Sequence, residues 1–410
     1  MFVINIIIYL TLLSIFLKSL SIKYLRIFYK LIFKSIRDKM AVKEKRVELI
    51  ELFYDLIFVY AISRLTSLIS EPINGGIDSN ALFVYVITSF VILQAWLYFT
   101  NYVNRYGEWN WYEYLIACIN MISVIYMANT ISANWVFMYL PFNLSMLIML
   151  LTVLSLYMVH VYREKTLNCA AGNSVTILSV VCLIYILALI AIYLNLSAVV
   201  IWIDVIAVLV GAFLPFFLKG NFDRSIISFP HLTERFELLT IITFGEAIVG
   251  MAHFFDISHF NLIPIMVFFI ILTMFGSYVV QIHNLVNHHR EERSLRLMFS
   301  HYFIVISINL VTVALELIHS GEINHWIVSG MMIISLIVFY VSIMANREYY
   351  YDNVKLSRKN ILSMVLVTFI GILVILTFID SLYGFLIGVL IVTCGNLAIL
   401  IDIYQKFLKD

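Results

Sequence analysis

Charged residues are scarce in this chain. They make up 12% of its 410 residues, about half the fraction usual in soluble domains, whereas hydrophobic residues make up 63%. A soluble globule needs a polar surface, and this chain has too few polar side chains to provide one. The composition therefore excludes a soluble globular protein and predicts that lipid covers much of the folded chain.

The sequence also lacks the motifs of disulfide frameworks, metal sites and common enzymes. Its four cysteines form no C-x-x-C pair, and no G-x-S-x-G, H-E-x-x-H or P-loop sequence occurs. The adjacent His288 and His289 diverge by about 100° on a helix, so we interpret them as a solvated helix end rather than a chelate. We expect no enzyme activity, no metal, no cofactor and no nucleic-acid partner. An intramembrane acid–base pair of Glu246 with His253 is the enzymatic alternative left open.

Long apolar segments fill the chain after residue 46. Each is close to the roughly 20 residues that a helix needs to cross the membrane, and isolated strands are excluded because lipid cannot satisfy their backbone groups. The sequence therefore predicts an all-α polytopic membrane protein with about 12 transmembrane helices. The predicted spans are 49–70, 81–101, 112–133, 135–159, 174–194, 197–218, 236–255, 261–283, 297–319, 325–345, 361–379 and 382–404.

Lysine and arginine are absent from every second loop. All but one of the 26 lie in alternate connections or in the terminal segments, and the exception is Arg64 inside the first span. Basic residues beside spans are retained in the cytoplasm, so we expect a multi-pass protein of the cell membrane with a cytoplasmic C-terminus. Arg64 either pairs with an acid or extends to the outer surface beside Glu71. The candidate acids are Asp204, Glu246 and Glu316.

Residues 1–45 are predicted to form a separate segment ahead of a transmembrane domain at 46–410. Residues 2–17 are apolar, and a basic run follows at 18–46. A cleaved signal peptide has its basic residues first, so we expect a retained short helix, either a thirteenth span or an interfacial helix. The basic amphipathic stretch at 18–39 is expected to lie on anionic lipid of the inner leaflet.

Three acids share one helix face at the start of the first span. Glu48, Glu51 and Asp55 lie within about 60° of one another. A charge at bilayer depth is costly, so these acids should face the protein interior or water. They form either a cation or proton site, or a cluster paired with Arg46 or Arg235.

The seventh span places Glu246 near the middle of the membrane. Its helix face also carries Thr243, Gly250 and His253. Small residues beside an acid let another backbone approach closely. This pattern predicts a buried site for proton coupling, or a packing seam in which Glu246 is protonated or pairs with Arg64.

The second span ends in amides and tyrosines. We expect Asn101 and Asn104 to hydrogen-bond to the acids of the first span. Tyr102 and Tyr106 are expected in the aromatic belt at the membrane interface.

Two sets of residues recur six spans apart. The motif Arg46-x-Glu48-Leu49 recurs as Arg235-x-Glu237-Leu238, and Tyr98, Asn101 and Asn104 match Tyr278, Gln281 and Asn284. These matches favour a 6+6 parallel repeat, an arrangement known in some transporters.

Three blocks of residues carry a family resemblance. They are Glu51-Leu-Phe-Tyr-Asp55-Leu-Ile-Phe-Val, Trp96-x-Tyr98-Phe-Thr100-x-Tyr102-x-Asn104-Arg105, and His231-Leu-x-Glu234-Arg235-Phe followed by Gly245-Glu246. Through them the chain resembles the bacterial low temperature requirement protein A (LtrA) family over roughly residues 46–405. The resemblance implies a polytopic membrane protein and marks motif positions, but it assigns them no role. Where the family typically has a tryptophan-rich eighth span, this chain has Phe275-Gly276-Ser277-Tyr278.

We expect a secondary transporter or permease coupled to protons or another cation, acting on an unknown small solute or ion. The alternative is a non-transporting membrane sensor or scaffold factor in cold adaptation. The candidate substrate- or ion-binding residues are Glu51, Asp55, Arg64, Asn101, Asn104, Arg105, Glu234, Arg235, Glu246 and His253.

Overall fold

A computed structural model describes most of the chain from residue 45 onward. The described residues are 45–70, 76–132, 135–164, 170–217, 226–255, 261–289, 294–321, 323–354 and 356–409. The expectations for residues 2–17 and 18–39, and for Glu71, lie outside them.

Twelve long helices run through the described residues, and none of these residues belongs to a strand of a sheet. The predicted all-α polytopic fold is therefore confirmed. The helices are α3 (Leu49–Ser70), α4 (Ser79–Tyr106), α5 (Trp111–Thr130), α6 (Trp135–Glu164), α7 (Ala170–Tyr193), α8 (Ser197–Phe217), α9 (Phe229–Gly250), α10 (Ile263–Tyr278), α11 (Leu295–Ser320), α12 (His325–Ala345), α13 (Arg358–Thr377) and α14 (Leu382–Phe407). Short helical turns extend three of them: η2 (Met251–Phe254) after α9, the π-helix η3 (Val279–Leu285) after α10, and η4 (Asn346–Tyr349) after α12.

Eleven of the described helices are long and apolar enough to cross a membrane. The remaining long helix is α9, which begins at Phe229, seven residues before the predicted start of the seventh span. The early start brings Glu234 and Arg235 inside the helix, so α9 carries more charge than an ordinary span. Arg235, expected in a loop, is instead buried in the second turn of α9.

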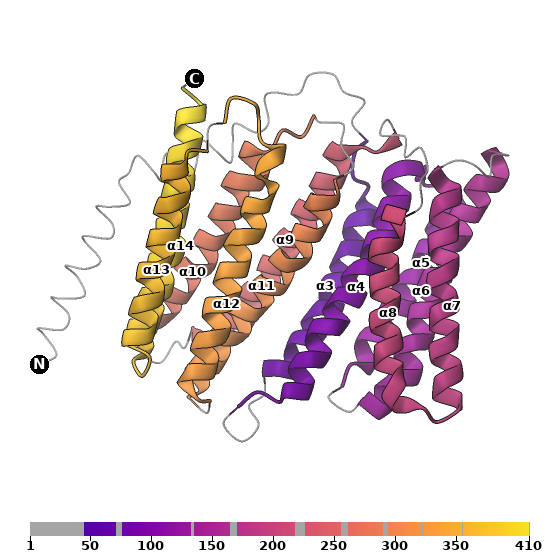
Figure 1. Ribbon diagram of the computed structural model, residues 1–410, viewed down its shortest axis with the longest axis horizontal. Coiled ribbons are helices and arrows are strands. Elements are labelled where there is room, and N and C mark those ends of the chain that lie inside the picture. The colour runs from indigo at the N-terminus through magenta and orange to yellow at the C-terminus, as the bar shows by residue number, and fades with distance from the viewer. Residues whose placement is uncertain are drawn as a thin grey trace, which may run out of the picture. The chain divides into compact units, whose positions relative to one another are not determined.

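The helices lie side by side in Figure 1. By the bounds of the helices, nearly all the described basic residues lie at or near one end of them. We call this the basic end. Its residues include Lys45, Arg105, Arg163, Arg296, Arg347, Arg358 and Lys406. Among the described lysines and arginines, Arg64 alone lies toward the opposite end, since it follows Leu49 by four helical turns. The alternation seen in the sequence thus corresponds to two ends of the helix array.

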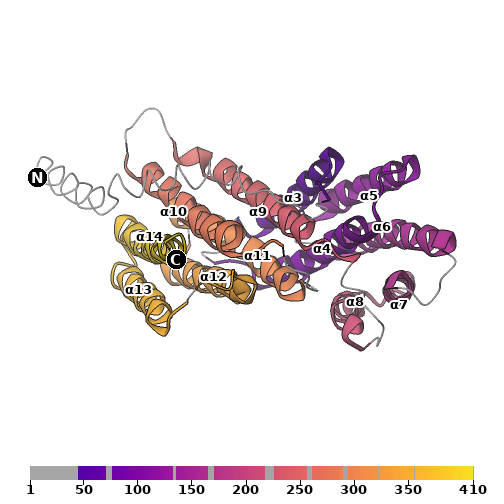
Figure 2. The ribbon, with the colours of Figure 1, turned by 90° about the horizontal axis from the view of Figure 1, so that it is seen from above.

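Helices α3–α8 gather on one side and α9–α14 on the other in Figure 2. The same helix pairs are in contact in the two halves: α3–α5, α5–α6, α7–α8 and α4–α8 in the first, and α9–α11, α11–α12, α13–α14 and α10–α14 in the second. The halves meet where α3 and α4 pack against α9 and α11. Helix packing therefore supports a 6+6 repeat.

The short motif that begins at Arg46 and recurs at Arg235 does not occupy equivalent places in the two halves. Arg46 and Glu48 are exposed and precede α3, whereas Arg235 is buried within α9. Support for the repeat thus comes from the order of helix contacts and not from the short motif.

Candidate functional site

Three charged side chains form a buried ionic cluster near the basic end. Arg235 donates from Nε to Asp55 Oδ2 at 3.0 Å and from Nη2 to Asp55 Oδ1 at 2.5 Å, a bidentate arginine–carboxylate pair. Its Nη1 donates to Glu51 Oε2. None of the three side chains is exposed. The two acids therefore face the protein interior, as predicted, and are paired with Arg235.

Two tryptophans complete the cluster. Trp96 Nε1 donates to Asp55 Oδ1 at 2.7 Å, and Trp109 Nε1 donates to Glu51 Oε1 at 3.1 Å. The guanidinium carbon of Arg235 lies 5.6 Å from the centre of the Trp96 ring, within cation–π range. Every carboxylate oxygen of the cluster thus has a partner, which makes it a closed network and not an open cation site.

The backbone of Trp109 is held in an unfavourable conformation. Its φ is 56°, in the left-handed region that a bulky side chain rarely adopts. Such a residue persists only where its surroundings enforce it. The hydrogen bond from its indole to Glu51 is one such constraint, so the short connection between α4 and α5 is adapted to the cluster.

His231 extends the cluster toward the start of α9. The Asn104 amide is oriented by Ser228, because its Nδ2 donates to Ser228 O at 2.7 Å and its Oδ1 accepts from Ser228 N–H at 3.2 Å. Asn104 Nδ2 also lies 3.1 Å from His231 Nδ1, which must therefore accept. The imidazole hydrogen is then on Nε2, which lies 3.1 Å from Glu51 Oε2, although outside good hydrogen-bond geometry.

Two carboxylates face one guanidinium in the cluster, and Lys45 lies beside them. Its ammonium donates to Val103 O and, at 2.7 Å, to Gly107 O. Burial lowers the pKa of Lys45, whereas the charges of Glu51 and Glu113 raise it. Lys45 thus binds the end of α4 and partly compensates the charge of the cluster.

Glu246 lies in a different seam, between α3 and α9. Ser63 Oγ donates to Glu246 Oε1 at 2.5 Å, and Glu246 is half-buried. One turn further, Gly250 faces α11 so closely that a Cβ there would lie 2.7 Å from Glu316 Oε1. The close approach of another helix that we predicted at Gly250 is therefore present, and the neighbouring helix is α11. The partner of Glu246 is Ser63 and not Arg64, and the side chain of His253 lies outside the described part of the structure.

Arg64 is exposed on α3 and forms no ion pair with any described residue. The acids proposed as its partners lie elsewhere: Glu246 bonds to Ser63, and Asp204 lies 3.5 Å from the amide of Asn143. The exposed position favours extension of Arg64 toward the end of the helices opposite the basic end.

A cavity of about 460 Å³ lies between α4, α7, α8 and α11. Its walls are mostly apolar, and its polar lining from α4 consists of Gln94, Tyr98, Asn101 and Arg105. The lining residues Leu209, Phe213 and Phe303 are exposed, so the cavity opens on the outer face of the helices. Asp55, Arg64 and Glu246 do not line it.

Comparison with protein families identifies the chain. The family model described as bacterial low temperature requirement A protein (LtrA) matches residues 46–394, most of the chain. The chain belongs to the LtrA family. No curated protein and no solved structure matches it. The resemblance found in the sequence is thus confirmed.

The LtrA motif positions fall into three places. Glu51, Asp55, Asn104 and Arg235 belong to the ionic cluster or support it, whereas Arg105 lines the cavity and Glu246 lies in the seam with Ser63. The two remaining motif positions, Glu234 and Gly245, are exposed. The structure therefore separates candidate residues that the sequence treated as one site.

Several partner assignments made from the second span are wrong. Asn104 bonds to Ser228 and His231 instead of the acids of α3, because His231 lies between Asn104 and Glu51. Asn101 lines the cavity. Tyr102, expected in the aromatic belt, is buried and donates to Glu113 Oε1 at 2.9 Å.

Sequence reasoning missed Trp96, Trp109 and His231 as members of the cluster. Trp96 and His231 belong to the motif blocks of the LtrA family, and this membership could have indicated their place in the cluster. Nothing in the sequence marked Trp109, because it reaches Glu51 through a tertiary contact over 58 positions.

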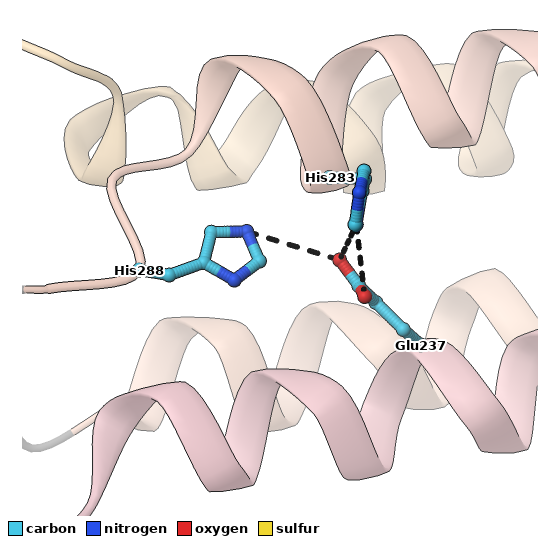
Figure 3. Close-up of side chains that lie close together, drawn as sticks. All are labelled: Glu237, His283 and His288. Carbon is cyan, nitrogen blue, oxygen red and sulfur yellow. Dashed lines mark hydrogen bonds and ion pairs between the residues drawn. The ribbon is translucent and has the colours of Figure 1, made fainter. Parts of the chain in front are cut away.

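One group of side chains in this LtrA protein has the arrangement of a metal site. Glu237 of α9, His283 of η3 and His288 of the following loop point toward one another in Figure 3. The interpretation of His288 as a solvated helix end is wrong, because its side chain is only 22% exposed and turns toward Glu237.

Proposed function

We propose that this LtrA protein is a secondary transporter or permease and that the cavity between α4, α7, α8 and α11 is its substrate site. The proposal rests on one observation, a line of polar side chains that enters an otherwise apolar cavity. Its volume of about 460 Å³ is within the range of sites for small ligands.

The polar line follows one face of α4. Gln94, Tyr98, Asn101 and Arg105 are spaced by four, three and four residues, which places them within about 60° around the helix and along about 16 Å of its axis. That length is about half of the hydrocarbon thickness. The line ends at Arg105 in the last turn of α4, at the basic end.

The deep end of the line is held firmly by α8. In the orientation that satisfies its amide, Gln94 donates to Val208 O at 3.2 Å and accepts from Ala212 N–H at 3.1 Å and from the Tyr98 hydroxyl at 2.8 Å. A Cβ at Gly211 would lie 1.9 Å from the Tyr98 oxygen, so only glycine allows this approach. The polar groups nearest the membrane centre are thus fixed, and the groups toward Arg105 are the ones proposed to meet substrate.

These features favour an amphiphile with an anionic head group. Arg105 attracts an anionic group at the basic end, and the apolar walls accept a hydrocarbon portion entering from lipid. No aspartate, glutamate or histidine lines the cavity among the described residues, which disfavours a cation as the substrate.

The ionic cluster then has a structural role in the proposed transporter. It joins α3 and α4 of the first half to α9 of the second. Coupling to protons is assigned to Glu246, which is half-buried and separate from the closed cluster. We further propose residence in the cell membrane with the basic end in the cytoplasm.

The test uses the purified protein in liposomes with a lysophosphatidic acid that carries a fluorescent label on its acyl chain. Transbilayer movement is followed by quenching of the probe in the outer leaflet, and binding is followed by fluorescence polarisation in detergent. We expect movement of this anion to exceed that of the equally labelled zwitterionic lysophosphatidylcholine. Arg105→Gln should weaken binding of the anion about 10- to 100-fold, the equivalent of one charged hydrogen bond.

Arg163→Gln is the matched control, because Arg163 is also an arginine at the basic end but does not line the cavity. Equal effects of the two substitutions, or equal movement of the two lipids, would contradict the proposed site. Binding that depends on Arg105 without any transbilayer movement would favour the second candidate, a non-transporting lipid sensor. The same lateral cavity supports that candidate.

A further inference from the structure

Glu237, His283 and His288 lie at distances that suit ligands of one ion. His283 Nδ1 is 3.1 Å from each carboxylate oxygen of Glu237, and His288 Nε2 is 3.8 Å from Glu237 Oε1. All three ligand atoms lie within 4.8 Å of one another. In a tetrahedral zinc site with bonds of about 2.0–2.1 Å, neighbouring ligand atoms are about 3.3 Å apart. The spacing between Glu237 and His283 is close to this value, and the spacing between Glu237 and His288 is about 0.5 Å longer. Binding of an ion would draw His288 toward the other two ligands.

We propose that Glu237, His283 and His288 bind a divalent transition-metal ion of the zinc class. Two imidazoles and one carboxylate are ligands that zinc uses in proteins, and three protein ligands leave a fourth position for water or another group. The site is independent of the proposed transport cavity, since none of its three residues lines that cavity.

The protonation chemistry of the site is compatible with a metal. In the present arrangement His288 Nε2 donates to Ile282 O at 3.1 Å, so coordination through Nε2 requires the neutral imidazole to carry its hydrogen on Nδ1. Burial lowers the pKa of His288, which favours the neutral ring that a metal requires. The ligand atom of His283 is Nδ1, so a hydrogen there must move to Nε2 or be released when a metal binds.

The backbone presents the three ligands from separate elements. The α-helix α10 changes at Val279 into the π-helix η3, which carries His283, and the chain leaves the helix before His288. Single π-helical turns are rare and often occur at functional sites. Side-chain exposures of 37% for His283 and 13% for Glu237 leave a path for the ion from the basic end. A bound ion would link α9 to the connection between α10 and α11.

The experiment measures zinc binding to the full chain in detergent after treatment with a chelator. We expect one equivalent of zinc per chain, a rise in melting temperature on adding zinc, and the visible absorption of a tetrahedral site when cobalt(II) replaces zinc. His288→Ala and Glu237→Gln should weaken binding by about 100-fold or more, because even residues that merely support metal ligands contribute 10- to 100-fold.

His289→Ala is the matched control, because His289 is the adjacent exposed histidine and should leave binding unchanged. The cobalt spectrum and the zinc-dependent melting of the unaltered chain test the site even if a ligand variant does not fold. Absence of binding to the unaltered chain would overturn the proposal. Equal loss of binding in the His289 and His288 variants would overturn it as well.

Discussion

At the scale of single residues, Arg235 is the one side chain on which the buried ionic cluster depends. Among the residues that the structure describes, it alone supplies a positive charge in contact with both Glu51 and Asp55. Two carboxylates in a buried environment would otherwise repel each other and lose solvation without compensation. Of the two alternatives for Glu51 and Asp55, the contacts of Arg235 therefore favour the ion-paired cluster over a cation or proton site.

Replacing Arg235 with glutamine should therefore destabilise the protein by about 3–5 kcal/mol, the typical cost of removing one partner from a buried ion pair. Thermal or chemical unfolding in detergent would measure it. Arg163→Gln is the control, because Arg163 and Glu108 are 57% and 69% exposed and such pairs contribute about 0–1 kcal/mol. Similar stabilities for the two variants would show that the cluster contributes little.

Glu246 gives the second prediction at this scale. Glutamine at position 246 keeps an oxygen that accepts from Ser63 Oγ but cannot titrate. If Glu246 couples transport to protons, Glu246→Gln should abolish flux of the lysophosphatidic acid driven by a pH gradient while leaving the melting temperature nearly unchanged. Ser63→Ala removes the bond and keeps the acid, so it should retain pH-driven flux. Full pH-driven flux in Glu246→Gln would exclude this role.

At the scale of elements, α13 depends mainly on one neighbour. It packs along α14 and has few contacts with α12. Only 17% of its most apolar stretch of 18 residues is buried in the protein. Gly371 and Gly388 face each other in the α13–α14 seam, and a Cβ on either would lie under 3 Å from the backbone oxygen of the other. Without a hydrophobic force between helices in lipid, such close backbone packing is what holds a peripheral helix.

Gly388→Val should consequently separate α13 from α14 and destabilise the protein by about 1–3 kcal/mol, the usual cost of overpacking. The measurement is thermal unfolding in detergent together with cross-linking of a cysteine pair placed across the seam. Gly330→Val on α12 is the control, because no atom lies within 4 Å of a Cβ built there. The packing argument fails if both variants melt at the same temperature and cross-link equally.

At the scale of the whole molecule, the described helices form two sequential halves that share several equivalent helix contacts, among them α3–α5 with α9–α11 and α7–α8 with α13–α14. The seam between them contains the ionic cluster at the basic end, with the Glu246–Ser63 pair further along α3 and α9. The cavity lies on one flank of this seam, lined mainly by α4, α7 and α8 of the first half and α11 of the second. A relative movement of the halves would therefore change both the seam and the cavity.

The orientation of the molecule can be tested directly. In a chain whose own cysteines are replaced, Ser381→Cys at the opposite end should react with a membrane-impermeant maleimide on intact cells. Ser357→Cys at the basic end should react only after permeabilisation, because positive loops stay inside. Both serines are exposed next to helix starts, so they serve as matched positions. The opposite labelling pattern would reverse the proposed orientation.

Sequence alone predicted the long helices well, because each span must satisfy its own backbone and bury enough apolar surface in lipid. The main error of position concerned α9. The hydropathy pattern predicted a start at residue 236, whereas the helix begins at Phe229 and includes the charged residues before 236. Hydropathy cannot detect a charge that a tertiary partner neutralises, and Arg235 is such a charge.

By its own pattern, the amino-acid sequence determined the all-α class, the even count of predicted spans after residue 46, the segregation of basic residues and the inward direction of Glu51 and Asp55. These properties depend on local composition and helical periodicity. Only the tertiary structure decided that Arg235, Trp96 and Trp109 close the ionic cluster, that Asn101 and Arg105 line a cavity, and that Glu237 meets His283 and His288. These contacts join helices that are distant in sequence, and the packing of whole helices selects among the many pairings that the same helix faces allow.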